Sequence, residues 1–330
     1  MSPPAPRDAV RGVRTRARRP RWRLAGLLGL LAGACAAPRA ETARFELFVL
    51  GTAQDGGMPH FGCERACCVE ARRDGRVLHP ACLGIVDHDK AALVLVEATP
   101  HIEQQVAELH RLAGIAGRGR QPIDAVLVTH AHIGHYLGLA FCGREVASTR
   151  QLPVHCSPRF AAFLRGNGPW RQLVELEQIV PREFVPEQPF APIEGIEVIA
   201  IAVPHRDEFS DTMAFRIRGP RRTVLFVPDI DAWDRAPGLL DHLLAGVDIA
   251  YVDGTFFDGS ELPERNLAEI RHPLMTDTMR RLDGFARQHP GAVRFIHLNH
   301  TNPALHDAAI RDRIDAAGFR VARPGECVAL

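Results

Sequence analysis

One stretch decides the fold of this chain, and it reads Ala125-Val126-Leu127-Val128-Thr129-His130-Ala131-His132-Ile133-Gly134-His135. Its apolar first half is typical of a buried β-strand, and three histidines follow directly. Imidazoles at positions i and i+2 that leave a strand end can face one point, and a third at i+5 reaches the same cavity from the following turn. We therefore expect a metal site here, in preference to a polar loop with fortuitous histidines.

Metal-binding residue types recur at the ends of other apolar runs. His205 follows the run 197–203, Asp229 follows the run 223–227, and His297 ends the run 293–297. Singly, such residues cap strands or form hydrogen bonds more often than they bind metals. Together, their repetition indicates one shared metal site at one edge of a sheet.

Short β-type runs alternate with helical patterns from residue 45 to the end of the chain. Strands are expected at 45–50, 83–87, 92–97, 125–129, 154–156, 197–203, 212–217, 223–227, 249–253 and 293–297. Helices are expected at 101–113, 159–164, 237–245, 273–287 and 304–317. No repeat or linker divides this region, so we expect one α/β domain over residues 45–330.

The charge of the chain is concentrated near its N-terminus. The 330 residues include 40 basic and 39 acidic ones, a net charge of +1. Eight arginines and one acid, Asp8, precede residue 24, and without these nine residues 32 basic and 38 acidic residues remain, a balance of −6. Bulk charge therefore argues against a nucleic-acid partner and leaves a small-molecule substrate as the expectation.

The same arginine-rich segment predicts a signal peptide over residues 1–36. It precedes the apolar run 24–34, which is too short to span a bilayer and ends in small residues around Cys35. Three routes stay open: an ordinary leader cut after Ala36, a twin-arginine leader at Arg18-Arg19, or a lipoprotein leader with lipid on Cys35. All three predict an exported, periplasmic protein, and only the lipoprotein route gives it a membrane contact, through the lipid anchor on Cys35.

Three of the eight cysteines lie in one loop, Gly62-Cys63-Glu64-Arg65-Ala66-Cys67-Cys68. Adjacent cysteines rarely satisfy disulfide geometry with each other, so the cluster indicates a metal site. A disulfide that joins Cys63 or Cys68 to Cys82 is the alternative, because exported proteins meet an oxidising compartment. The isolated cysteines are expected to be buried small hydrophobes without chemistry.

The order of these histidines and the aspartate resembles that of the metallo-β-lactamase superfamily over nearly all of residues 45–330. That resemblance implies an αββα sandwich with two metals between the sheet edges. Three segments are similar to the pyrroloquinoline quinone biosynthesis protein B (PqqB) branch, near the cyclic phosphodiesterase PhnP and ribonuclease Z. They are 50–59, 248–257 and 297–303.

The resemblance also assigns ligands. It gives the first metal His130, His132 and His205, and the second metal His135, Asp229 and His297, with Asp229 as a bridge. Two departures matter. Gly134 stands where the superfamily has Asp, so the second metal is expected to lose one carboxylate. The chain also keeps the full histidine set, which PqqB proteins often lack.

PhnP-like and PqqB-like proteins hold a structural zinc in a cysteine-rich loop. The resemblance therefore implies a Cys₃His zinc site made by Cys63, Cys67, Cys68 and His300, because His300 lies three residues after His297.

At the catalytic site, Zn²⁺, Mn²⁺ or Fe²⁺ would lower the pKa of bound water and supply hydroxide at neutral pH. The expected function is hydrolysis of a phosphodiester or other small ester, with Asp229 and His272 as catalytic residues. A surface position for His272 is the alternative for that residue. A PqqB-like, iron-dependent oxidative step and a non-enzymatic metal carrier are the alternatives for function.

Overall fold

The computed structural model describes residues 43–263, 266 and 271–330. The predicted signal peptide, residues 1–36, lies outside these residues. No helix within the described ranges is long and apolar enough to cross a membrane.

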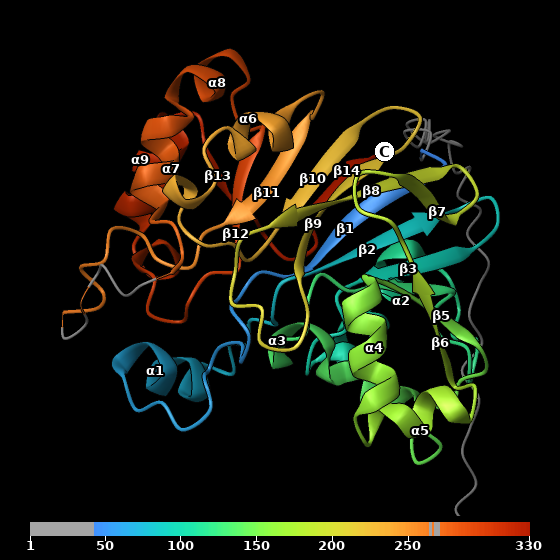
Figure 1. The fold of residues 1–330 in the computed structure, drawn as a ribbon. Helices are drawn as coiled ribbons and strands as arrows, with labels where there is room; N and C mark the ends of the chain where they lie inside the picture. The colour runs from blue at the N-terminus through green and yellow to red at the C-terminus, as the bar shows by residue number, and fades with distance from the viewer. Residues whose placement is uncertain (1–42, 264–265, 267–270) are drawn as a thin grey trace, which may run out of the picture. The chain divides into compact units, whose positions relative to one another are not determined.

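Two sheets form the centre of the domain that begins at Ala43 (Figure 1). In spatial order, the first sheet contains β14 (Cys327–Ala329), β1 (Phe45–Gly51), β2 (Cys82–Asp87), β3 (Ala92–Val96), β4 (Ala125–Leu127), β5 (Leu152–Cys156) and β6 (Ile179–Glu183). The second sheet contains β13 (Arg320–Val321), β12 (Val293–Ile296), β11 (Ile249–Asp253), β10 (Thr223–Val227), β9 (Thr212–Arg218), β8 (Ile196–Val203) and β7 (Pro189–Ile193).

An apolar core lies between the two sheets, where Leu83 and Val96 of the first sheet meet Phe215 and Phe226 of the second. Helices bury the outer face of each sheet. The first is covered by α2 (Ile102–Ala113), α4 (Pro158–Gly166), α5 (Trp170–Glu175) and the 3₁₀ helix η1 (Leu137–Cys142). The second is covered by α6 (Leu239–Leu244), α7 (Met275–Arg281), α8 (Asp283–Gln288), α9 (Ala308–Ala316), η2 (Trp233–Arg235) and η4 (Pro303–Leu305). These four layers confirm the expected αββα sandwich.

Strand directions bring several strand ends to the same edge of each sheet. In the second sheet β10, β11 and β12 are parallel, and β8 points the same way because both β8 and β10 run antiparallel to β9. In the first sheet β1, β3 and β4 share one direction by the same reasoning. The residues that follow these strands therefore emerge together, which is where a site can be assembled.

The structure corrects the sequence-based expectations in two helices. The helix expected at 273–287 is two helices, α7 and α8, with a break at Leu282. The helix expected at 304–317 begins only at Ala308, because Asp307 caps it and the residues before it form η4. The strands β6 and β7 were not expected because proline disfavours strand formation, and β6 contains one proline and β7 contains two.

Candidate metal centre

The predicted ligands lie at the shared strand ends. His130 and His132 follow β4, and His135 lies on the short helix α3 (Ile133–Tyr136) that comes next. His205, Asp229 and His297 follow β8, β10 and β12 respectively. The structure thus brings all six predicted metal ligands to one place.

The first metal position is a cluster of four residues, His130, His132, His205 and Asp229, whose ligand atoms all lie within 4.8 Å of one another. His130 Nε2 lies 2.8 Å from His132 Nδ1, which lies 3.2 Å from His205 Nε2. Asp229 Oδ2 lies 3.1 Å from His205 Nε2 and 3.5 Å from His130 Nε2. This cluster contains the predicted first-metal ligands, with Asp229 beside them.

Outer partners orient these rings. The hydroxyl of Thr129 donates to Glu97, so His130 Nδ1 must donate its proton to Thr129 Oγ1, 2.9 Å away. His132 Nε2 lies 2.9 Å from Glu208 Oε2 and donates to it. Each bond assigns the proton to the outward nitrogen and leaves the inward nitrogen with its lone pair, as in many metal-binding histidines.

The second metal position is a cluster of Asp55, His135 and His297. Asp55 Oδ1 lies 3.4 Å from His135 Nε2 and 3.7 Å from His297 Nε2. Asp229 Oδ2 lies 3.8 Å from His135 Nε2, so this carboxylate stands between the two positions. Asp55 was not predicted as a ligand, although the rule that found the others, an acid or histidine after an apolar strand, also applies to it after β1.

His272 is part of the same centre and not a surface residue. Its Nδ1 lies 2.9 Å from Asp253 Oδ2 and 3.2 Å from Asp229 Oδ1, and its side chain is 13% exposed. Burial lowers the pKa of His272, but the carboxylates of Asp253 and Asp229 outweigh it and raise that pKa to about 9. Asp253, which ends β11, is a further residue of this centre that the sequence analysis did not single out.

The donor set fits divalent cations. Burial, helped by neighbouring His135, lowers the pKa of His130 well below its usual value, and burial lowers that of His132. Two unprotonated nitrogens 2.8 Å apart repel each other, and a cation that both bind removes this repulsion. Glu97, Asp229, Asp231 and Asp253 are all buried around the histidines, and buried carboxylates require compensating positive charge.

The cysteine loop gathers three of its four predicted ligands. Cys63, Cys68 and His300 lie within 4.8 Å of one another, with Cys63 Sγ 3.4 Å from His300 Nε2. Burial lowers the pKa of His300 to about 4, so its ring is neutral and able to bind a metal. Cys67 is not in this group, because it and Cys68 are consecutive on α1 (Ala66–Asp74) and consecutive helical side chains point about 100° apart.

The structure leaves Cys63, Cys67, Cys68 and Cys82 as free thiols. Cys82 lies on β2, where its thiol donates to the backbone oxygen of Glu97, 3.7 Å away. It packs in the core beneath the first sheet, while Cys68 packs with Met58 and Ala71. The alternative disulfide to Cys82 is therefore not formed here.

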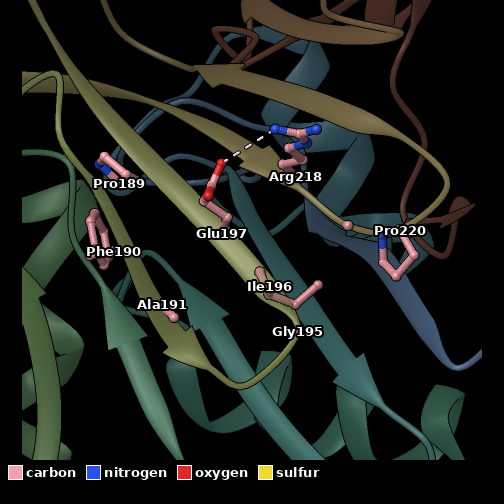
Figure 2. Close-up of a pocket in the computed structure, with 9 residues that line it drawn as sticks. Pro189, Phe190, Ala191, Gly195, Ile196, Glu197, Arg218 and Pro220 are labelled. Carbon is pink, nitrogen blue, oxygen red and sulfur yellow. Dashed lines mark ion pairs between the residues drawn. The ribbon is translucent and has the colours of Figure 1, made fainter.

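A separate hollow lies at the other end of β8 (Figure 2). It has a volume of about 520 Å³, and Gly195, Ile196 and Glu197 line it at the start of the strand. Glu197 faces Arg218 across it at 3.7 Å. His205 follows the opposite end of the same strand, about 25 Å away at roughly 3.3 Å per residue. This hollow is therefore distant from the metal centre.

The sequence profile of the Beta-lactamase superfamily domain matches residues 93–297, well over half of the chain. The chain belongs to the metallo-β-lactamase superfamily. Coenzyme PQQ synthesis protein B of Methylobacterium sp. (strain 4-46) is 26% identical over 301 residues, which cover 85% of this chain and 98% of that protein. The superfamily assignment and the likeness to the PqqB branch are thereby confirmed.

Two solved metallo-β-lactamase superfamily structures share the fold. Zinc-bound PqqB from Methylobacterium extorquens aligns with a TM-score of 0.72 at 21% identity, covering 86% of this chain and all of that one. A diphosphatase of the PhnP family aligns with a TM-score of 0.60 at 18% identity, covering 86% of this chain and 96% of that one. At these identities the likeness shows the fold, while the buried histidine and aspartate cluster supports a metal cofactor in this chain.

Proposed function

We propose that this protein is a metal-dependent hydrolase of phosphodiesters or other small esters. One observation carries the proposal: two adjacent metal positions, with Asp229 between them, lie at one edge of the superfamily sandwich. Divalent cations held there would lower the pKa of a water molecule and stabilise negative charge that develops on an attacked ester. The zinc in the PqqB structure favours Zn²⁺ as the cation, with Mn²⁺ or Fe²⁺ as alternatives.

His272 is the proposed proton donor to the leaving group. Asp253 Oδ2 accepts from its Nδ1 at 2.9 Å, which fixes the ring and leaves Nε2 as the nitrogen that carries the transferred proton. Asp229 contacts both His272 and His205, so it couples the proton donor to the metal positions. These contacts support the proposal that Asp229 and His272 have the catalytic roles expected from the sequence.

Two arginines at the rim support an anionic substrate. Arg235 Nη1 lies 3.0 Å and Arg271 Nη1 3.5 Å from Asp231 Oδ2, and each arginine side chain remains about half exposed. The other oxygen of Asp231 lies 3.4 Å from His205 Nδ1. Asp231 alone thus separates both guanidinium groups from the metal ligand His205. Positively charged, half-exposed groups so close to a metal position attract phosphate esters.

The PqqB relatives favour a second candidate, an iron-dependent oxidative step at the same ligands. A carrier that binds metal without turnover is the third. The PhnP-family diphosphatase and the full histidine set favour hydrolysis over both.

The test is hydrolysis of bis(p-nitrophenyl) phosphate by zinc-loaded protein. Turnover should disappear on chelation and return on addition of zinc. His272→Asn should lower kcat while metal content stays unchanged, and His289→Asn, an exposed histidine on another surface, should leave kcat unchanged. Fully metal-loaded protein that hydrolyses neither this diester nor simple carboxylic esters would refute the proposal.

A further inference from the structure

Gly134 occupies the position at which the superfamily resemblance places an acidic ligand of the second metal. A Cβ atom built on Gly134 would lie 2.2 Å from Asp55 Oδ1 and 2.5 Å from Asp55 Cα. Real side chains do not approach so closely, and one of these atoms is backbone. An aspartate at position 134 is therefore incompatible with the present position of Asp55.

Asp55 fills the same space with its own carboxylate. Its Oδ1 faces His135 Nε2 at 3.4 Å and His297 Nε2 at 3.7 Å. All three atoms are buried, and none has a hydrogen-bond partner among the described residues. Three buried polar atoms without partners, one anionic oxygen and two ring nitrogens, are the donor set that a divalent cation satisfies.

The loop that carries Asp55 is fixed to the strand end that carries His297. Gln54 N donates to Leu298 O at 2.9 Å, and Leu298 N donates to Thr52 O at 2.8 Å. The side chain of Asn299 also donates to Gln54 Oε1 at 2.6 Å. Asp55 itself has a φ of +21°, a conformation that aspartate, asparagine and glycine tolerate better than other residues. Hydrogen bonds between these two segments therefore hold the loop that positions the Asp55 carboxylate beside His297.

We propose that Asp55 is the carboxylate ligand of the second metal position, supplied from the loop after β1 in place of an acid at position 134. This relocation restores the carboxylate that Gly134 removes, so the second position keeps one aspartate and two histidines. The inference rests on the proposed function only in that both require metal at this centre. Its test measures metal binding and does not depend on catalytic turnover.

The test counts metal without substrate. Wild type, Asp55→Asn and Asp55→Gly are titrated with Co²⁺, whose visible absorption reports each occupied position, and metal per chain is measured after dialysis against Zn²⁺. Both substitutions suit the backbone at this position. Because loss of even an outer partner weakens metal affinity about 10-fold or more, each variant should lose one equivalent or bind it at least about 10-fold more weakly. Asp74→Asn, an exposed acid on α1, is the control and should match wild type.

Wild-type stoichiometry and affinity in both Asp55 variants would overturn the proposal. If neither variant folds, a crystal structure of zinc-loaded wild type decides, because a ligand oxygen must lie about 2.0–2.2 Å from the ion. An Asp55 Oδ1 beyond that distance refutes the assignment. If the Asp55 variants lose one metal equivalent but metal-loaded wild type hydrolyses no ester, the assignment of Asp55 as a ligand stands and the proposed function fails.

Discussion

Cys68→Ser tests the structural metal site in the cysteine loop. Cys68 is fully buried and faces Cys63 and His300, so replacing its thiol removes one of three clustered ligands. A metal present at 100 times its dissociation constant stabilises a fold by about 2.7 kcal/mol. In a domain of this size, about 2–4 °C of melting temperature corresponds to 1 kcal/mol, so the variant should melt about 5–10 °C lower.

The assay is a thermal melt of purified protein with and without a chelator, together with zinc analysis. Chelation should lower the melting temperature of Cys68→Ser by about 5–10 °C less than that of wild type, because the chelator removes metal from the catalytic centre of both proteins but from the cysteine loop of wild type alone. Cys67→Ser is the matched control, because it makes the same substitution one residue earlier at a thiol outside the group. His300→Ala should reproduce the Cys68→Ser result.

An unchanged zinc content in Cys68→Ser and His300→Ala would refute this reasoning. A disulfide predicts a different pattern, in which reductant alone lowers the melting temperature and chelation frees no thiols for a thiol reagent. That pattern would show that the cysteines of this loop form a disulfide and do not bind a metal.

Three other predictions concern the first metal position, the N-terminal segment and a buried carboxylate. His132→Ala removes a ligand of the first metal position, so turnover should fall at least about 100-fold with the fold retained by circular dichroism; full activity would contradict the assignment. The signal-peptide prediction implies a mature chain that begins near residues 35–37, and N-terminal sequencing that finds Met1 in the cytoplasm would contradict it. Burial raises the pKa of Asp87, but hydrogen bonds from Arg44 and two backbone amides lower it below its ordinary value of 3.8. Because the folded pKa is the lower one, the stability advantage of wild type over Asp87→Asn should be present above about pH 4 and lost as the pH falls towards the folded pKa; an advantage independent of pH between 2 and 6 would argue against the Arg44 contact.

Strongly patterned elements were predictable from the sequence. All ten expected strands are present, because apolar runs such as those of β8 and β10 are buried by sheet packing in the way their patterns indicate. Strand β7 was missed because its prolines oppose strand formation locally, and pairing with β8 supplies what local propensity lacks. The division of α7 from α8 at Leu282, a residue buried in the core beside the second sheet, was not visible in the helical periodicity.

The site was predictable where ligands repeat a simple rule. His130, His205 and His297 all follow apolar strands, and strand direction then brings them together. Asp55 follows an apolar strand and Asp253 ends one, so the same rule applies to both, but the sequence does not show that these two strand ends lie beside the histidines. The replacement of an acid at position 134 by Asp55 is visible only in three dimensions, since the two residues lie far apart in the chain.

Oxygen-isotope labelling during turnover tests the central claim most directly, namely that this centre performs hydrolysis. Zinc-loaded protein is given bis(p-nitrophenyl) phosphate in ¹⁸O-labelled water without oxygen gas. We predict an unchanged rate relative to aerobic conditions and one ¹⁸O atom in each product monoester, supplied by water. Activity that requires iron and consumes oxygen, with no ester cleavage under anaerobic conditions, would contradict it.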